Sequence, residues 1–196
     1  MSSATAPTAR ERILDTASRL FYRHGFVSVG VDTIIAEAGV AKMSLYRHFA
    51  SKDDLIVAFL EESNERFWAW FDAATGDGTP LEQLVNVFDA LGAFATSPAC
   101  FGCMFQLAAA DFPDPEHRAN RIALAHKNTV LDRFRDLASQ AESPEPDALA
   151  GQLLLLMDGA FVASRMFRRA SPAAYVGQAA RAIITSGTRG ASPGRR

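Results

Sequence analysis

The chain has 196 residues, of which 48% are apolar and 21% charged, a balance typical of globular proteins and not of disordered or fibrous chains. Two cysteines exclude a disulfide framework, and we find neither a signal peptide nor an apolar run of about 18 residues for a membrane span. The net charge of −2 is unevenly distributed: residues 1–52 carry seven basic and four acidic side chains, against 13 and 18 in the remainder.

Apolar residues recur at helical spacing from Arg10 onwards, with no alternating strand pattern, so we expect an all-α fold. Residues 1–9, rich in Ser, Thr, Ala and Pro, are predicted to form a flexible tail. The first helix is predicted to end at His24 and Gly25, since glycine is common just after helices.

Residues 30–49 have the pattern of two short helices joined by a tight turn. Ile34 and Ala38 share one face of the first helix, Gly39 supplies the turn, and Leu45 and Phe49 share one face of the second. The other faces of the second helix carry hydrogen-bond donors suited to phosphates and base edges, and no acid: Lys42, Ser44, Tyr46, Arg47 and His48. This pattern predicts a DNA-binding helix-turn-helix on a basic segment. The alternative is a helical hairpin with a solvated basic face.

The rest of the chain is predicted to be helical as well. Ser51 is a candidate N-cap for a long helix to about Ala74, and the glycine- and proline-containing residues 75–80 form the first break. Ser97-Pro98 and Asp114-Pro115 have the pattern of helix starts. The further helices are expected at 80–95, from 97 to about 110, from 114 to about 141, at 147–168 and at 172–187, before a flexible tail at 188–196.

The stretch from Arg10 to about Leu60 resembles the N-terminal domain of TetR-family transcriptional regulators. The matching pieces are RERILDTASRLFYRHGF, IIAEAGVAKMSLYRHF and SKDDLIVAFL. The resemblance implies an all-helical homodimer that binds a palindromic DNA operator, usually as a repressor, and is released by a small-molecule effector. It implies a DNA-binding domain at 10–52, with the helix-turn-helix at 30–49, and an effector-binding and dimerisation domain at 53–187.

The resemblance also assigns DNA contacts by position. Base edges or adjacent phosphates are expected at the start of the second short helix, a thymine methyl or a phosphate at Tyr46, and phosphates elsewhere. The predicted contact residues are Thr33, Lys42, Met43, Ser44, Tyr46, Arg47, His48 and Lys52. The chain departs from the family pattern at Gly30, where Ser or Thr is frequent, and at Ala41, where Ser is frequent. Alanine has no side-chain oxygen to cap a helix, at a cost of about 1 kcal/mol.

The central part of the chain is rich in aromatic and methionine side chains. One interpretation is a cavity between helices for a small apolar or amphipathic effector. The other is a well-packed core without a ligand. Candidate lining residues are Trp68, Cys103, Met104, Phe105 and Gln106.

The last two predicted helices are apolar around most of their circumference, more than a monomer of this size readily buries. Two copies packing as a four-helix bundle would cover both surfaces through a two-fold interface. A single deeply buried core helix is the alternative. Candidate interface residues are Leu149, Leu153, Leu156, Ala160, Ala163, Phe167, Val176, Ala180 and Ile183.

Two further groups of residues have ambiguous patterns. Cys100 and Cys103 form a CxxC near a predicted helix start, which favours a thiolate, so a thiol-based redox sensor or redox protein is an alternative function beside buried structural cysteines. An acidic group with one histidine is interpreted as helix-start residues and not as a metal site: Asp111, Asp114, Glu116 and His117. No enzyme signature or cofactor motif is present, and a helical scaffold that never binds DNA is a third possibility.

Overall fold

The computed structural model describes residues 6–188, and within this range every regular element is helical, which confirms the all-α prediction. The described chain forms two compact units. The first unit comprises the chain up to Glu65 together with Met104–Leu124, and the second comprises Arg66–Cys103 together with the chain from Ala125. Helices α4 (Lys52–Thr75) and α7 (Arg118–Gln140) each contribute to both units.

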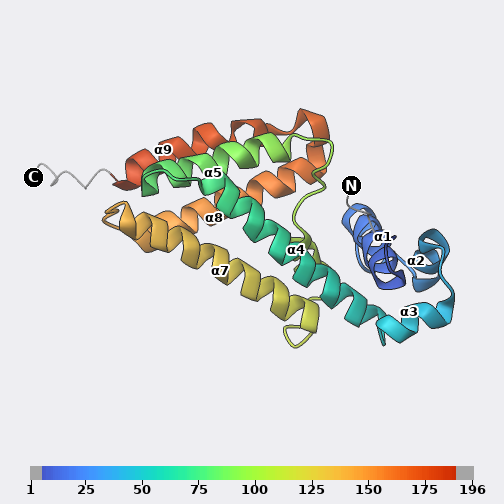
Figure 1. The fold of residues 1–196 in the computed structure, drawn as a ribbon. Coiled ribbons are helices and arrows are strands. Elements are labelled where there is room, and N and C mark those ends of the chain that lie inside the picture. Colours follow the sequence, from blue (N-terminus) through green and yellow to red (C-terminus); the bar gives the residue numbers. More distant parts are fainter. Residues whose placement is uncertain (1–5, 189–196) are drawn as a thin grey trace, which may run out of the picture. The chain divides into compact units, whose positions relative to one another are not determined.

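Three helices of the first unit, α1 (Ala9–His24), α2 (Val31–Ala38) and α3 (Lys42–His48), pack closely together (Figure 1). Thr8 begins α1 with a reciprocal capping box to Glu11, which satisfies free N–H groups at the helix start. These helices and the start of α4 share one apolar core. Its fully buried side chains include Ile13, Phe21, Phe26, Ile34, Leu45, Leu55, Ile56, Phe59 and Leu60.

The short helix α6 (Met104–Asp111) also belongs to the first unit. The carboxylate of Asp111, at its last residue, accepts hydrogen bonds from the backbone N–H groups of Phe26 at 2.9 Å and Val27 at 3.3 Å. A charged acceptor strengthens such bonds, so α6 is held to the connection between α1 and α2 by a contact 85 residues apart in sequence.

The second unit is built around α5 (Pro80–Ala95), α8 (Pro146–Phe167) and α9 (Val176–Thr188), which lie side by side (Figure 1). The later parts of α4 and α7 add Phe71 and Phe134 to the same core. The core includes Leu84, Val87, Phe88, Leu91, Val130, Leu137, Leu153, Met157, Phe161 and Ala180.

Residues 146–170 are helical, and this segment is long and apolar enough to cross a membrane by length and composition alone. This finding corrects the expectation that no segment meets that test. Core helices of soluble proteins meet it as well, and Leu153, Met157 and Phe161 of this segment are buried inside the second unit. It is therefore weak evidence for a membrane span.

Two predicted helix starts are wrong. Ser97-Pro98 begins no helix, because the chain stays non-helical until Met104. Helix α7 starts at Arg118, after a turn in which Asp114 Oδ1 accepts the backbone N–H of Glu116. Proline after a small polar residue is equally compatible with a turn, and here the turn forms. The last predicted helix likewise opens with a 3₁₀ turn, Pro172–Tyr175, before α9.

His126 is a buried titratable group on α7, within the second unit. Its ring lies 4.6 Å from that of Phe67, between ring centroids, and its exposed fraction is 4%. Burial, reinforced by the neighbouring Lys127 charge, lowers the pKa of His126 from 6.5 to about 3. The folded protein therefore holds a neutral imidazole, whereas the unfolded chain takes up a proton below pH 6.5.

This difference predicts a pH-dependent stability. Because the folded pKa is depressed, the contribution of His126 is complete above about pH 6.5 and is lost as pH falls toward 3. We expect the free energy of unfolding to drop by about 2 kcal/mol between pH 7 and pH 5, measured by urea denaturation. His126→Gln should remove most of this drop. His24→Gln, at an exposed position, should retain it, and an equal drop in both variants would contradict the assignment.

Candidate DNA-binding site

The turn between α2 and α3 depends on Gly39. Its φ of 63° and ψ of 41° lie in the left-handed region, which glycine occupies without a Cβ penalty. The N–H groups of Gly39 and Val40 donate to the carbonyls of Ala36 and Ile35, both at 3.3 Å, and so close the end of α2. This geometry confirms the helix-turn-helix predicted for residues 30–49.

Helix α3 has one buried face and a broad exposed face. Leu45 is fully buried and Phe49, just beyond the helix, is 4% exposed, as their four-residue spacing predicts. On the outer side, Met43 is 74% exposed and Tyr46 is 41% exposed, so both large side chains are accessible to solvent. Lys42, Arg47 and His48 are exposed beside them.

The starts of α2 and α3 lack side-chain caps, in line with their sequences. Gly30 and Ala41 both have extended backbone angles suitable for an N-cap, but neither supplies a side-chain acceptor. At the next helix, Ser51 does cap: its Oγ accepts the N–H of Asp54 at 3.1 Å and donates to the Asp54 carboxylate at 2.8 Å.

The polar and charged residues predicted to contact DNA differ in how exposed they are to solvent. Thr33 is exposed near the start of α2, and Lys42 Nζ lies 3.6 Å from the carboxylate of Asp32, with both side chains largely exposed. Lys52 is half-buried: burial lowers the pKa of its ammonium group, while the charges of Asp53 and Asp111 oppose that shift. Of these two lysines, Lys42 is therefore the more exposed to solvent.

The predicted acidic group has structural partners. His117 accepts the N–H of Ala119 at 3.2 Å on its Nδ1, stacks on Phe112, and lies 3.6 Å from the Asp53 carboxylate. Next to it, Arg118 forms a 2.6 Å ion pair with Asp54, which lowers the pKa of that carboxyl. Across residues 6–188, no group of three or more His, Cys, Asp or Glu side chains has an arrangement suited to a metal ion.

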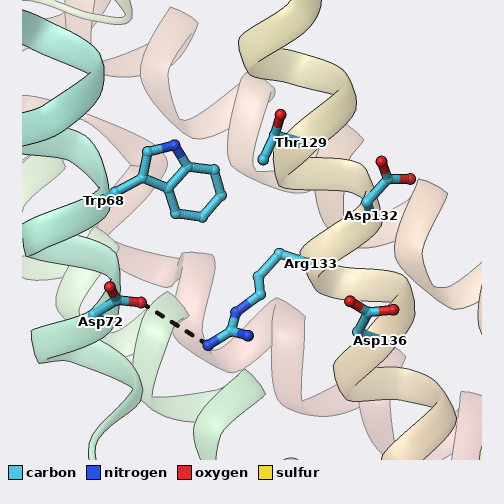
Figure 2. Close-up of a pocket in the computed structure, with 6 residues that line it drawn as sticks. All are labelled: Trp68, Asp72, Thr129, Asp132, Arg133 and Asp136. Atoms are coloured by element: carbon cyan, nitrogen blue, oxygen red, sulfur yellow. Dashed lines mark ion pairs between the residues drawn. The ribbon is translucent and has the colours of Figure 1, made fainter.

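The predicted effector residues are divided between the two units. Trp68 and Cys103 belong to the second unit, where both are half-buried. Met104 and Phe105 of the first unit are buried and Gln106 is half-buried. Only Trp68 lines the open pocket of about 540 Å³ found within the second unit (Figure 2).

That pocket lies between α4 and α7, and sequence analysis missed most of its lining. Figure 2 shows the Trp68 indole extending from α4 toward α7, with Asp72 on the same helix facing Arg133. The Arg133 guanidinium lies 3.9 Å from the Asp72 carboxylate. The remaining lining residues, all on α7, are Thr129, Asp132 and Asp136. In the sequence, the four-residue spacings 129/133 and 132/136 are the only signal that could have placed these residues on one face of α7.

The predicted interface residues lie mainly inside the chain's own core. Five are buried there and are not available to a partner in this conformation: Leu149, Leu153, Ala160, Val176 and Ala180. Leu156, Ala163 and Ile183 are half-buried, and Phe167 is 54% exposed. The prediction selected this stripe of α8 because its spacing is regular, but the stripe packs against α5 and α9 of the same chain.

A different stripe of α8 faces away from the core. It comprises Leu155 (74% exposed), Val162 (48%) and Met166 (70%), with Gly151 and Gly159 in the same row. A Cβ built on either glycine would meet open space. Positions 151, 155, 159, 162 and 166 follow helical spacing and form one continuous face.

Comparisons with known proteins agree with this geometry. The family of bacterial regulatory proteins, tetR family, matches residues 13–59. A TetR-family transcriptional regulator from Streptomyces coelicolor is 36% identical with a TM-score of 0.84, covering 92% of this chain and 94% of its own. A second TetR regulator structure, from Streptomyces avermitilis, is 31% identical with a TM-score of 0.81, covering 92% and 98%.

The curated relatives show the same relationship. The HTH-type transcriptional regulator YjdC of Escherichia coli is 24% identical over 166 residues, which span 84% of this chain and 86% of that protein. The helix-turn-helix, the helical second unit and these likenesses over nearly the whole chain lead to one conclusion. The protein is a DNA-binding transcriptional regulator of the TetR family.

Proposed function

We propose that the protein is a non-enzymatic cytoplasmic repressor that binds a palindromic operator as a homodimer and is released by a small effector. The observation that carries the proposal is the outer face of α3, where Met43 and Tyr46 are exposed among hydrogen-bond donors. Such a face pairs cationic groups with phosphates and apolar groups with thymine methyls in the major groove. In a two-fold dimer, two copies of α3 would contact half-sites about 34–36 Å apart.

Selection of bound duplexes from a random DNA pool at near-physiological salt tests the operator. We expect enrichment of an inverted repeat, because a two-fold dimer presents two identical α3 helices. Weak binding without a consensus would mean that the basic segment attracts DNA only nonspecifically, and would contradict the proposal.

The selected operator then separates the roles of two neighbouring side chains. Lys42→Ala should weaken binding about tenfold on all sequences and reduce the salt dependence, since it removes a phosphate contact. Met43→Ala should leave the salt dependence unchanged and relax selection at one base pair by about 1–3 kcal/mol. Arg169→Ala, at an exposed position of the second unit, is the matched control. Identical behaviour of all three variants would rule out α3 as the specificity element.

The exposed α8 stripe supports the proposed dimer. Leu155, Val162 and Met166 form an apolar row, and Gly151 and Gly159 leave room for a second helix to approach closely. A face of this kind is self-complementary when two copies meet across a two-fold axis. Phe167 and Tyr175, 54% and 68% exposed, extend the apolar surface near the end of α8.

Charge placed on this stripe should prevent association. We expect Leu155→Glu to weaken dimerisation by at least about tenfold, because a carboxylate would be buried against apolar side chains. Sedimentation equilibrium measures the change. Leu81→Glu, on α5 at a residue that is 38% exposed, is the matched control and should remain dimeric. If both variants associate like the wild type, the dimer uses another face.

The pocket in the second unit is the proposed effector site. Its walls combine the Trp68 indole with three carboxylates and one guanidinium. Arg133 faces Asp72, and Asp132 is hydrogen-bonded by Arg135, whereas Asp136 has no ion pair with any residue that the structure describes. An aromatic surface beside excess negative charge favours an amphipathic molecule that bears a positive charge.

A pair of probes tests the preferred charge. We expect tetraphenylphosphonium, a cation, to bind at least about tenfold more tightly than neutral triphenylphosphine oxide, measured by calorimetry. Asp136→Asn should reduce that preference, and Asp77→Asn, exposed in the α4–α5 connection, should not. Equal affinity for both probes would overturn the cationic class while leaving DNA binding untouched.

A further inference from the structure

The CxxC sequence forms a loop that the proposed function does not use. Residues 100–103 end the first of the two segments that make up the second unit, Arg66–Cys103. The next residue, Met104, begins α6 in the first unit. Gly102 has a φ of 97°, and a Cβ there would lie 3.3 Å from the Phe161 carbonyl oxygen and from Arg165 Cβ. The loop therefore packs tightly against the end of α8, and both cysteines are free thiols.

Cys100 is buried and hydrogen-bonded. Its side chain is 2% exposed, and its Sγ lies 3.2 Å from the Oγ of Ser164. Ser164 has a single hydroxyl proton, which it donates to the Phe161 carbonyl at 2.8 Å. The Cys100 S–H must then be the donor to Ser164 Oγ.

Cys103 has the opposite surroundings. It is half-buried, not buried, and directly precedes Met104, the first residue of the eight-residue helix α6. Two guanidinium groups meet the same loop. Arg165 Nη1 donates to the Phe101 carbonyl at 3.0 Å, and the Arg168 guanidinium lies 4.2 Å from the Phe101 ring centroid. Cys103 is half-buried whereas Cys100 is 2% exposed, so Cys103 is the thiol that a small oxidant in water reaches first.

We propose that this loop is a peroxide-sensitive thiol pair in which Cys103 reacts first and Cys100 resolves the product. The Cys103 thiolate attacks one oxygen of hydrogen peroxide: an S–O bond forms, the O–O bond breaks, and the leaving hydroxide takes up a proton to become water. The Cys100 sulfur then attacks the Cys103 sulfur. The S–S bond forms, the S–O bond breaks, and hydroxide leaves as water with the Cys100 proton. In balance, two thiols and one peroxide give one disulfide and two waters.

The thiol pair is joined to the first unit through the chain itself, because Cys103 directly precedes α6. A disulfide would remove the Cys100 hydrogen bond to Ser164 and would constrain the residue that precedes α6. At the other end of α6, Asp111 accepts the N–H groups of Phe26 and Val27 between α1 and α2. A shift of α6 along this path would lengthen those bonds, so oxidation is expected to weaken operator binding.

Thiol mapping by mass spectrometry after treatment with hydrogen peroxide tests the pair without any DNA, so its failure is distinguishable from failure of the proposed function. The wild type should lose both thiols and the mass of two hydrogen atoms within one peptide. Cys100→Ser should accumulate a sulfenic acid at Cys103 that dimedone traps. Cys103→Ser should leave Cys100 reduced, reacting at least about tenfold more slowly. Cys100→Ala serves as a second variant if serine disturbs the buried site.

Three results would overturn the proposal: oxidation of Cys100 in Cys103→Ser at the wild-type rate, a disulfide between two chains in place of the internal one, or a wild type whose Cys100 stays free while Cys103 is oxidised. Operator affinity is measured on the same samples. A loss that reverses with dithiothreitol, and is absent from both single variants, is expected. Equal affinity of oxidised and reduced wild type would contradict the connection through α6.

Discussion

The DNA-binding surface depends on the burial of two side chains. Helix α3 has seven residues, and a helix this short is not stable in water without tertiary contacts. It also lacks a side-chain N-cap at Ala41. Leu45 and Phe49 supply the missing stability by entering the core of the first unit, and this leaves Met43 and Tyr46 facing outward. The orientation of the groups that we propose to contact DNA is thus a consequence of packing on the opposite face of the same helix.

The first unit is completed by residues far along the chain. Asp111 on α6 accepts two backbone N–H groups near the end of α1, and Arg118 pairs with Asp54 at the start of α4. These contacts join the segments that flank the helix-turn-helix to the stretch 104–124, which is continuous in sequence with the second unit on both sides. Local changes in α6 or at the start of α7 can therefore act on the first unit through specific hydrogen bonds and ion pairs.

Helix α8 has one apolar row buried in the core of the second unit and another apolar row exposed to solvent. Leu153, Met157 and Phe161 are buried in the second unit, while Leu155 and Met166 are exposed. Both rows have helical spacing and similar composition, so periodicity alone cannot distinguish them. The difference arises because α5 and α9 cover one side of α8 and leave the other uncovered.

The sequence by itself determined the fold class, the helix-turn-helix and the buried positions Leu45 and Phe49, because these follow from short-range periodicity and from the conformational freedom of Gly39. It also located the cysteine pair. Only the tertiary structure decided which thiol is buried, which α8 row is exposed, and that Asp111 joins α6 to the connection between α1 and α2. Each of these depends on a partner tens of residues away, such as Ser164 for Cys100, and spacing along one helix carries no information about that partner.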